Sequence, residues 1–207
     1  MKLDSLQVGM IGTNCYLLTD ETAGNATAVI DPGGSADQIL ARIRKNNLDV
    51  KLILLTHGHF DHVLGVPDLL AVYPDLPVYI TETDYPEARD GGQFGYKMGP
   101  VESVQFYDEG STVHVGNLAV DVLRTPGHTP GSVTLKVEDV LFTGDTLFNG
   151  SCGRTDFPGG SFADMQRSLK RLSDLPGNYR VYPGHEGSTS LEYERRFNPY
   201  MLRPWDL

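Results

Sequence analysis

Short runs of hydrophobic residues recur along the whole chain and alternate with polar segments that carry glycine, proline or aspartate. Runs rich in Val, Ile, Leu and Tyr that end at such residues are typical of buried β-strands. The pattern predicts eight strands, at Cys15–Leu18, Thr27–Ile30, Leu52–Leu55, Val78–Ile80, Leu118–Leu123, Ser132–Val137, Val140–Phe142 and Arg180–Tyr182.

Three other segments space their hydrophobic residues as an amphipathic α-helix does. They are Ala36–Lys45, with Ser35 expected as its N-terminal cap, Asp68–Val72 and Phe162–Leu172. Strands and helices alternate in the first half of the chain, and the second half is strand-rich before it becomes helical. This order predicts an α/β protein with two packed sheets and helices outside them. The length suits a single domain over residues 1–207.

Several predicted strands run directly into a short loop that carries histidine or aspartate. The segments LILLTH, DVLRTPGH, LFTGD and VYPGH end at His57, His128, Asp145 and His185. Loops held by a rigid scaffold are common positions for binding groups. We therefore expect these four side chains to converge at one edge of the sheets.

The loop after the third predicted strand has the densest cluster of metal-binding side chains, His57, His59, Asp61 and His62. Imidazole and carboxylate are the ligands that zinc and iron favour. His57 and His59 are two positions apart, so their side chains can point the same way if the chain is extended there. Asp61 and His62 follow a turn. One segment can thus supply two metal ions about 3.5–4 Å apart.

These motifs resemble those of a known family. The segments THGHFDH, PGHTPGS, FTGDTLF and YPGH, together with TNCYLL, IDPGG and GRTDFPGGS, resemble the metallo-β-lactamase superfamily, and within it the glyoxalase II-like (hydroxyacylglutathione hydrolase-like) branch. The resemblance runs from about Asn14 to the end of the chain. It implies a four-layer αββα sandwich with the metal site at one sheet edge.

The resemblance also implies two divalent metal ions, with zinc the expected metal and iron and manganese the alternatives. By correspondence with the family motifs, the first position takes His57, His59 and His128, the second takes Asp61, His62 and His185, and Asp145 bridges them. Asp31 is expected either to hydrogen-bond to the metal-binding loop or simply to form a turn before the first helix.

The expected reaction is hydrolysis of a thioester such as S-acylglutathione. A hydroxide bridging the two metals would attack the acyl carbon, and Asp61 is the expected catalytic residue that orients it. The chain has no GxSxG motif and no Cys/His pairing that would indicate a nucleophilic side chain. Arg154 and Asp156 correspond to a Lys and a Tyr that touch glutathione in the branch. Arg154 is thus a candidate substrate-binding residue, with an ion pair to Asp156 as the alternative.

Two other functions compete with this hypothesis. The segment SCGRTDF is also similar to iron-dependent persulfide dioxygenases, in which His57, His128 and Asp145 would hold one iron ion. The protein could also be a non-catalytic metal-binding module, although a complete set of seven ligands around an open site argues against that.

Composition narrows the class of partner. The formal net charge of −10 argues against a nucleic-acid partner and leaves a small-molecule substrate as the expectation. No hydrophobic stretch approaches the ~20 residues that span a membrane, and the start MKLDSLQVGM does not resemble a signal peptide, so a cytoplasmic protein is expected. Cys15 and Cys152 are expected to be reduced thiols. The oligomeric state is not visible in the sequence.

Two remaining features are expected to be structural. His114 alternates with hydrophobic neighbours and is predicted to be a structural strand residue outside the site. The segment Tyr193–Leu207 contains Phe197, Pro199, Tyr200, Leu202 and Trp205 and is predicted to pack on the core, with a contact surface as the alternative.

Overall fold

The structure is a computed structural model that describes residues 1–202. Its strands are β1 (Lys2–Val8), β2 (Thr13–Asp20), β3 (Ala26–Ile30), β4 (Asp49–Leu54), β5 (Val78–Ile80), β6 (Val104–Phe106), β7 (Thr112–Val115), β8 (Leu118–Arg124), β9 (Val133–Val137), β10 (Val140–Gly144), β11 (Leu147–Phe148), β12 (Ser151–Cys152), β13 (Arg180–Pro183) and β14 (Thr189–Ser190). Its helices are α1 (Ala36–Lys45), α2 (Phe60–Val63), α3 (Val66–Val72), α4 (Tyr85–Asp90), α5 (Phe162–Ser173) and α6 (Leu191–Phe197), with 3-10 turns η1 (Glu21–Ala23) and η2 (Gly92–Phe94).

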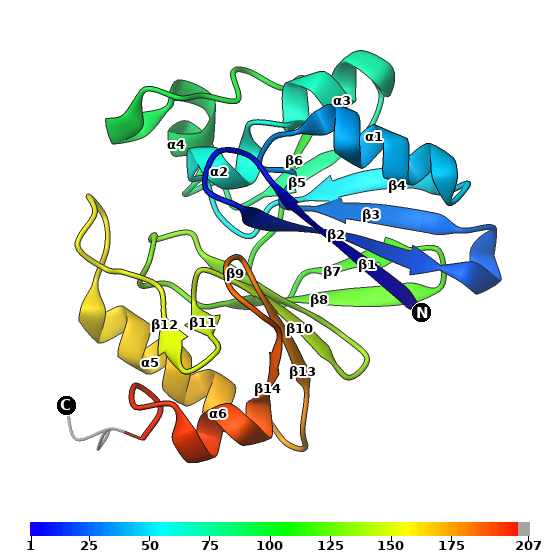
Figure 1. Cartoon of the computed structure of the whole chain (residues 1–207). Coiled ribbons are helices and arrows are strands. Elements are labelled where there is room, and N and C mark those ends of the chain that lie inside the picture. The colour runs from blue at the N-terminus through cyan, green and yellow to red at the C-terminus, as the bar shows by residue number, and fades with distance from the viewer. Residues whose placement is uncertain (203–207) are drawn as a thin grey trace.

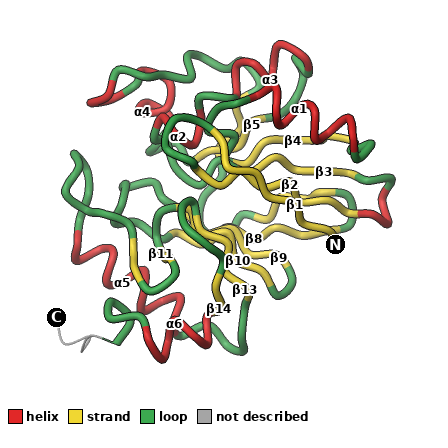
Figure 2. Tube along the Cα trace, viewed as in Figure 1, coloured by secondary structure: helices red, strands yellow, loops and turns green. Residues whose placement is uncertain are grey.

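Two six-stranded sheets form the centre of the molecule, and the short pair β11–β12 lies beside them. The first sheet has the order β1-β2-β3-β4-β5-β6 and the second has the order β14-β13-β10-β9-β8-β7. Figure 1 shows α1 and α3 on the outer side of the first sheet and α5 and α6 on the outer side of the second. Figure 2 shows the same layering, with the strands in the middle and the helices outside. The predicted α/β class and four-layer αββα sandwich are confirmed.

Three hydrophobic cores hold these layers together. Every residue of β2 is buried, because both faces of this strand are covered. Cys15 and Leu17 pack into the core beneath α1 and α3, whereas Tyr16 and Leu18 pack into the core between the sheets. A third core lies between the second sheet and α5 and α6. Burial on both faces explains why the strand runs are continuously hydrophobic.

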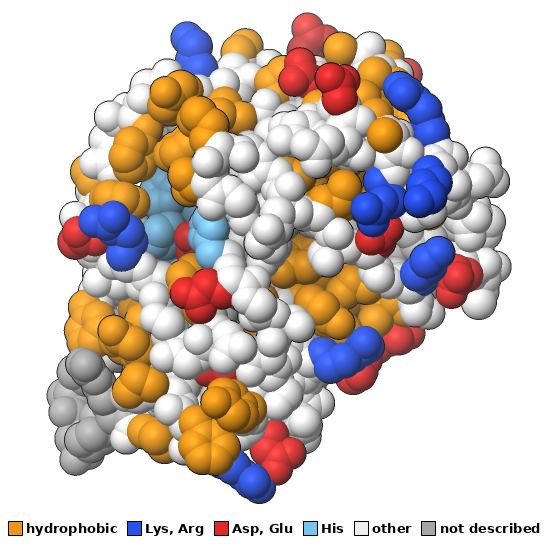
Figure 3. All heavy atoms as spheres, viewed as in Figure 1, with side chains coloured by type: hydrophobic (Ala, Val, Ile, Leu, Met, Phe, Trp, Pro, Cys, Tyr) orange, Lys and Arg blue, Asp and Glu red, His pale blue; other side chains and the backbone are white. Residues whose placement is uncertain are grey.

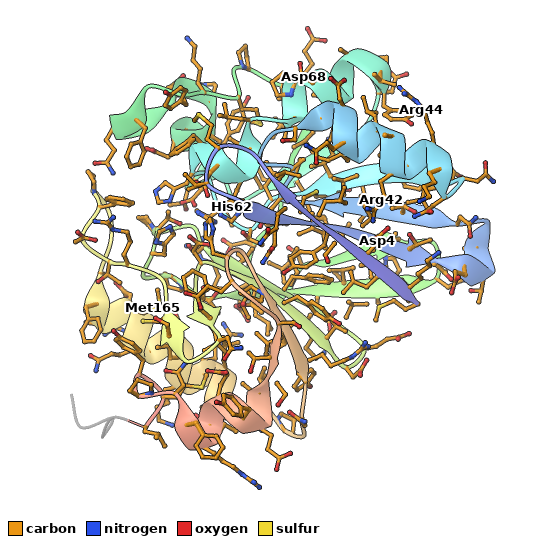
Figure 4. The ribbon with its side chains drawn as sticks, viewed as in Figure 1. Asp4, Arg42, Arg44, His62, Asp68 and Met165 are labelled. Atoms are coloured by element: carbon orange, nitrogen blue, oxygen red, sulfur yellow. The ribbon has the colours of Figure 1, made fainter. Side chains whose placement is uncertain are left out.

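Most predicted elements are present. Each of the eight predicted strands overlaps an observed strand, and Val78–Ile80 and Ala36–Lys45 agree at both ends. His114 lies exposed on β7, as expected for a structural strand residue. The sequence pattern missed β1, which forms the edge of the first sheet, because four of its seven residues are polar and its residues are mostly exposed or half-buried. Figure 4 shows how β1 is attached, with Arg42 on α1 reaching toward Asp4 on β1.

Ser35 differs from its prediction. It precedes α1, but its side chain makes no capping hydrogen bond and its φ of 50° is left-handed. Its hydroxyl instead accepts a hydrogen bond from the backbone N–H of Gly9, in the β1–β2 turn (3.1 Å). The serine ties two loops together because its backbone conformation turns the hydroxyl away from the helix.

The prediction for the C-terminal segment is only partly right. Tyr200 packs against the third core, whereas Phe197 and Leu202 are 61% and 56% exposed. The expectation that they pack on the core is wrong, because α6 covers the sheet with its opposite face through Leu191. Trp205 lies outside the described residues. Within residues 1–202, no helix has both the length and the hydrophobicity needed to cross a membrane.

Gly33 allows two loops that carry site residues to touch. A Cβ atom added to Gly33 would lie 1.5 Å from the carbonyl oxygen of Asp61. That oxygen belongs to the backbone of α2 and cannot move without shifting the helix that carries Asp61 and His62. The close approach of the β3–α1 loop to α2 therefore requires glycine.

We expect Gly33→Ala to lower the free energy of unfolding by about 3 kcal/mol or more. Overpacking a core typically costs about 1–3 kcal/mol, and the cost here should reach the upper end of that range because the clashing atom belongs to rigid backbone. Urea unfolding measures the change. Gly187→Ala is the matched control, since a Cβ at Gly187 meets nothing within 4 Å. Equal unfolding midpoints for the two variants would contradict this account.

Candidate metal centre

The seven predicted ligands come from five segments and meet at one edge of the sandwich. His57 and His59 lie in the loop after β4, and Asp61 and His62 lie on α2. His128 follows β8, Asp145 follows β10 and His185 follows β13. Figure 3 shows histidine side chains inside a hollow on this face, with hydrophobic side chains around it. The structure thus brings together all seven residues that the sequence singled out.

The first cluster consists of His57, His59 and His128. One ligand atom from each lies within 4.8 Å of the other two. His59 Nδ1 and His128 Nε2 are 2.8 Å apart. Three buried imidazoles so close together could hold a metal ion when they are neutral.

The second cluster consists of Asp61, His62 and His185, whose ligand atoms also lie within 4.8 Å of one another. Asp61 Oδ2 is 3.2 Å from His185 Nε2 and 3.3 Å from His62 Nε2. These two groups contain the residues that the family resemblance assigns to the two positions, and a third group, His57, His62 and Asp145, overlaps both.

Asp145 lies between the clusters. Its Oδ2 is 3.4 Å from His128 Nε2 and 3.5 Å from His185 Nε2, and its Oδ1 is 3.3 Å from His62 Nε2. One carboxylate therefore faces ligands of both positions. This is the placement expected of a bridging ligand in a two-metal site.

The residues fit a metal centre by an independent criterion. Among the described residues, the buried side-chain atoms without a hydrogen-bond partner are His57 Nε2, His62 Nε2 and Asp145 Oδ1. Buried polar atoms are almost always paired, because leaving one unpaired costs about 1–3 kcal/mol. All three atoms point into the same cluster, so one class of ligand, a cation bound by nitrogen and oxygen, would satisfy all of them.

The charges of the site lead to the same conclusion. Burial alone would lower the pKa of His62, but the carboxylates of Asp61, Asp31 and Asp145 raise it well above its ordinary value. Burial, aided by the neighbouring imidazoles, lowers the pKa of His59 to about 4. The surroundings of His62 favour a positive charge, and those of His59 favour a neutral imidazole that is free to bind metal.

Hydrogen bonds on the far side of each ring fix which nitrogen faces the centre. His62 Nδ1 donates to Asp31 Oδ2 (2.9 Å), because a carboxylate can only accept. His128 Nδ1 donates to the backbone carbonyl of Arg154 (2.7 Å). The Thr56 hydroxyl donates to Asp31 (2.7 Å) and can therefore accept from His57 Nδ1 (3.2 Å). Asp31 thus orients ligands of both positions, which supports the hydrogen-bonding alternative for this residue.

Asp84 is a residue that the sequence did not single out. Its buried carboxylate accepts hydrogen bonds from Gly58 N (3.0 Å), Thr129 Oγ1 (2.6 Å) and Gly131 N (2.7 Å). Gly58 lies between His57 and His59, and Thr129 follows His128. Asp84 therefore clamps together the two loops that supply the first position. Thr13, also unpredicted, donates to Asp61 Oδ2 (2.8 Å) and orients a ligand of the second position.

Arg154 lies on the wall of the cavity beside the site, but its guanidinium is already engaged. It donates to both oxygens of Asp156 (2.7 and 2.6 Å) and stacks over the ring of Phe157, 3.9 Å from the centroid. The structure thus adopts the ion-pair alternative, and a role for Arg154 in substrate binding stays a prediction. Cys15 is buried, Cys152 lies beside the cavity, and no disulfide joins them.

An αββα sandwich with a two-position His/Asp site at its edge defines a class of metalloproteins with dinuclear centres. The profile of the Metallo-beta-lactamase superfamily matches residues 8–185, and the chain belongs to this superfamily.

Individual members of the superfamily resemble this chain over nearly its whole length. The chain is 30% identical over 218 residues to hydroxyacylglutathione hydrolase GloC of Haemophilus influenzae, covering 97% of this chain and 98% of that protein. The solved structure of TTHA1623 in a di-iron-bound form is 36% identical, with a TM-score of 0.84 over 95% of this chain and 99% of the other. The structure of ETHE1 from Myxococcus xanthus is 30% identical, with a TM-score of 0.79 over 96% and 84% of the two chains.

The clamp formed by Asp84 generates a prediction about metal affinity. We expect Asp84→Asn to weaken metal binding at the first position about 10–100-fold, the range typical of residues that orient ligands. An amide keeps one acceptor oxygen and turns its NH2 group toward a donor. Stepwise titration of the metal-free protein with Co²⁺, followed by absorption spectroscopy, separates the two positions.

Asp31→Asn is the comparison variant, because Asp31 contacts His62 of the second position directly and reaches His57 of the first position through Thr56. It should weaken both binding steps, whereas Asp84→Asn should weaken one. Equal losses at both steps in the Asp84 variant would contradict a clamp specific to the first position, and circular dichroism of each variant controls for folding.

Removal of metal should destabilise the protein. A ligand present at 1,000 times its dissociation constant stabilises the native state by about 4 kcal/mol. For a chain of this size, we expect a chelator to lower Tm by about 10 °C, and added Zn²⁺ to restore it. Differential scanning calorimetry measures both, and an unchanged Tm after verified metal removal would mean that the site does not bind metal tightly in the native state.

Proposed function

We propose that the protein is a metal-dependent hydrolase of thioesters, similar to the glyoxalase II-like branch, with S-acylglutathione as the first substrate to test. The similarity to hydroxyacylglutathione hydrolase GloC supports this class of reaction. The net charge of −10 and the size of the cavity favour a small molecule over a nucleic acid.

One observation carries the proposal. Two ligand clusters share the carboxylate of Asp145 and open directly into a cavity of about 490 Å³, which has the volume of a small-molecule site. Asp61, His128 and His185 line this cavity as well as the metal positions. A substrate in the cavity would therefore have its reacting atoms beside the centre.

When bound, the metals would activate water at neutral pH and polarise the acyl carbonyl. We propose zinc as the metal, with iron and manganese as alternatives that accept the same donors. His57, His59 and His128 would hold one ion, Asp61, His62 and His185 the other, and Asp145 both. In the overall reaction, the C–S bond breaks, a C–O bond to the water oxygen forms, and the products are a carboxylic acid and a thiol.

Asp61 is the proposed catalytic residue. Burial opposes its ionisation, yet His62 and a hydrogen bond from His185 hold the pKa of its carboxyl far below the ordinary value. Asp61 is therefore a carboxylate at neutral pH, and it can accept a hydrogen bond from the attacking water and direct it toward the acyl carbon. The hydroxyl of Thr13 donates to Oδ2 of this carboxylate (2.8 Å), the same oxygen that faces His62 and His185.

Asp61→Asn should reduce kcat/KM for S-D-lactoylglutathione by at least about a thousandfold, because both a ligand charge and the orientation of water are lost. The loss is measured alongside metal content by elemental analysis. Asp139→Asn is the matched control, since that carboxylate is exposed and pairs with Arg180 away from the cavity. Near-wild-type turnover of the Asp61 variant with its metal lost would exclude this mechanism.

A second candidate is an iron-dependent persulfide dioxygenase. Two observations favour it: the segment SCGRTDF resembles this class of enzyme, and the ligands that it would need, His57, His128 and Asp145, lie close together. One tightly bound iron per chain and oxygen consumption on glutathione persulfide would replace the hydrolase proposal. Two bound metals without turnover of any thioester or lactone would instead support a non-catalytic metal-binding module.

A further inference from the structure

Aromatic rings line the cavity next to the first metal position. Phe94 and Phe157 lie 5.2 Å apart in an edge-to-face arrangement, and their centroids are 6.5 and 5.8 Å from that of His59. Phe60 continues this wall, with its ring 5.2 Å from that of Phe94. The three rings come from α2, η2 and the loop before α5, and they form one apolar surface.

The other side of the centre is apolar as well. The ring of Phe148 lies 6.0 Å from that of His185, a ligand of the second position, and Ile11 from the β1–β2 turn also lines the cavity. Phe94 is 39% exposed and Ile11 is 58% exposed, so these side chains leave apolar surface open to a ligand. Burial of that surface by an apolar group would favour binding.

The charged groups at the cavity do not suit an anionic substrate. Within residues 1–202, Arg154 is the only Lys or Arg that lines the cavity. Its guanidinium forms a bidentate ion pair with the carboxylate of Asp156. Glu186 lines the same cavity. Outside the metal positions and their ligands, one cation, Arg154, therefore stands with two carboxylates, Asp156 and Glu186, and a substrate carboxylate would compete with Asp156 for Arg154 and be repelled by both acids.

We propose that the cavity selects thioesters whose thiol half is apolar and carries no carboxylate, in preference to S-acylglutathione. This inference rests on thioester hydrolysis as the reaction. The wall of Phe60, Phe94 and Phe157 binds the apolar group. Asp156 sets the preference by occupying Arg154, the cation that a carboxylate-bearing thiol would need. The reaction itself is unchanged, with water cleaving the C–S bond.

Three substrates with the same acyl group test this preference. They are S-D-lactoylglutathione, its dimethyl ester and the D-lactoyl thioester of phenylmethanethiol, and kcat/KM is measured for each with the metal-loaded full chain. We expect the phenylmethanethiol ester to exceed S-D-lactoylglutathione by about tenfold or more, with the dimethyl ester between them. S-D-lactoylglutathione equal to or better than its dimethyl ester would overturn the inference.

Two variants separate the charge from the apolar wall. Asp156→Asn should raise the ratio of kcat/KM for S-D-lactoylglutathione to that for the phenylmethanethiol ester by about fivefold, because Arg154 becomes available. Phe94→Ala should lower kcat/KM for the phenylmethanethiol ester by about tenfold, mainly through KM. Phe197→Ala is the matched control, an exposed aromatic residue on α6 that does not line the cavity.

The outcomes distinguish this inference from the proposed function. If none of the three thioesters is hydrolysed while two metals are bound, thioester hydrolysis fails and the preference fails with it. If all are hydrolysed but the ratio does not respond to Asp156→Asn, or KM does not respond to Phe94→Ala, the function stands and the selection by these residues is wrong.

Discussion

Three carboxylates buried around one imidazole form the constraint on which the rest of the molecule depends. His62 lies 2.9 Å from Asp31, 3.3 Å from Asp61 and 3.3 Å from Asp145, and its own side chain is fully buried. Burying negative charge is very unfavourable unless positive charge accompanies it. The edge of the sandwich is therefore more stable when positive charge is present, either on His62 itself or on a bound cation, and the nearby loops keep ligand atoms facing inward.

The loops that carry the charged ligands are fixed by close contacts that involve backbone atoms, rather than by many flexible side chains. Gly33 lets the loop after β3 touch the backbone of Asp61, and Asp84 joins the loops on either side of the first position through three hydrogen bonds. Both devices use rigid backbone as one partner. Small errors in position are thereby prevented at the atoms that would bind metal, where a shift of a fraction of an ångström matters.

The sequence predicted the parts of this arrangement that are local. The continuous hydrophobic strands, helix Ala36–Lys45 and the ligands in the segment from His57 to His62 each depend on neighbours in the chain. Asp84 could not be found in this way, because its partners lie 26, 45 and 47 positions away and include two backbone amides, which leave no mark in the sequence. Ser35 failed for the same reason, since its hydroxyl pairs with Gly9, 26 positions earlier.

The candidate metal ligands and the cavity wall consist of different kinds of residue. The ligands are buried and constrain one another through Asp31, Asp84 and Asp145, so a change at any of them disturbs the whole centre. The cavity wall consists of half-buried or exposed side chains such as Phe94 and Arg154, which contribute little to the cores. Such positions can vary without loss of the fold. A relative that shares about a third of its residues therefore informs the metal chemistry more strongly than the identity of the substrate, which depends on the wall.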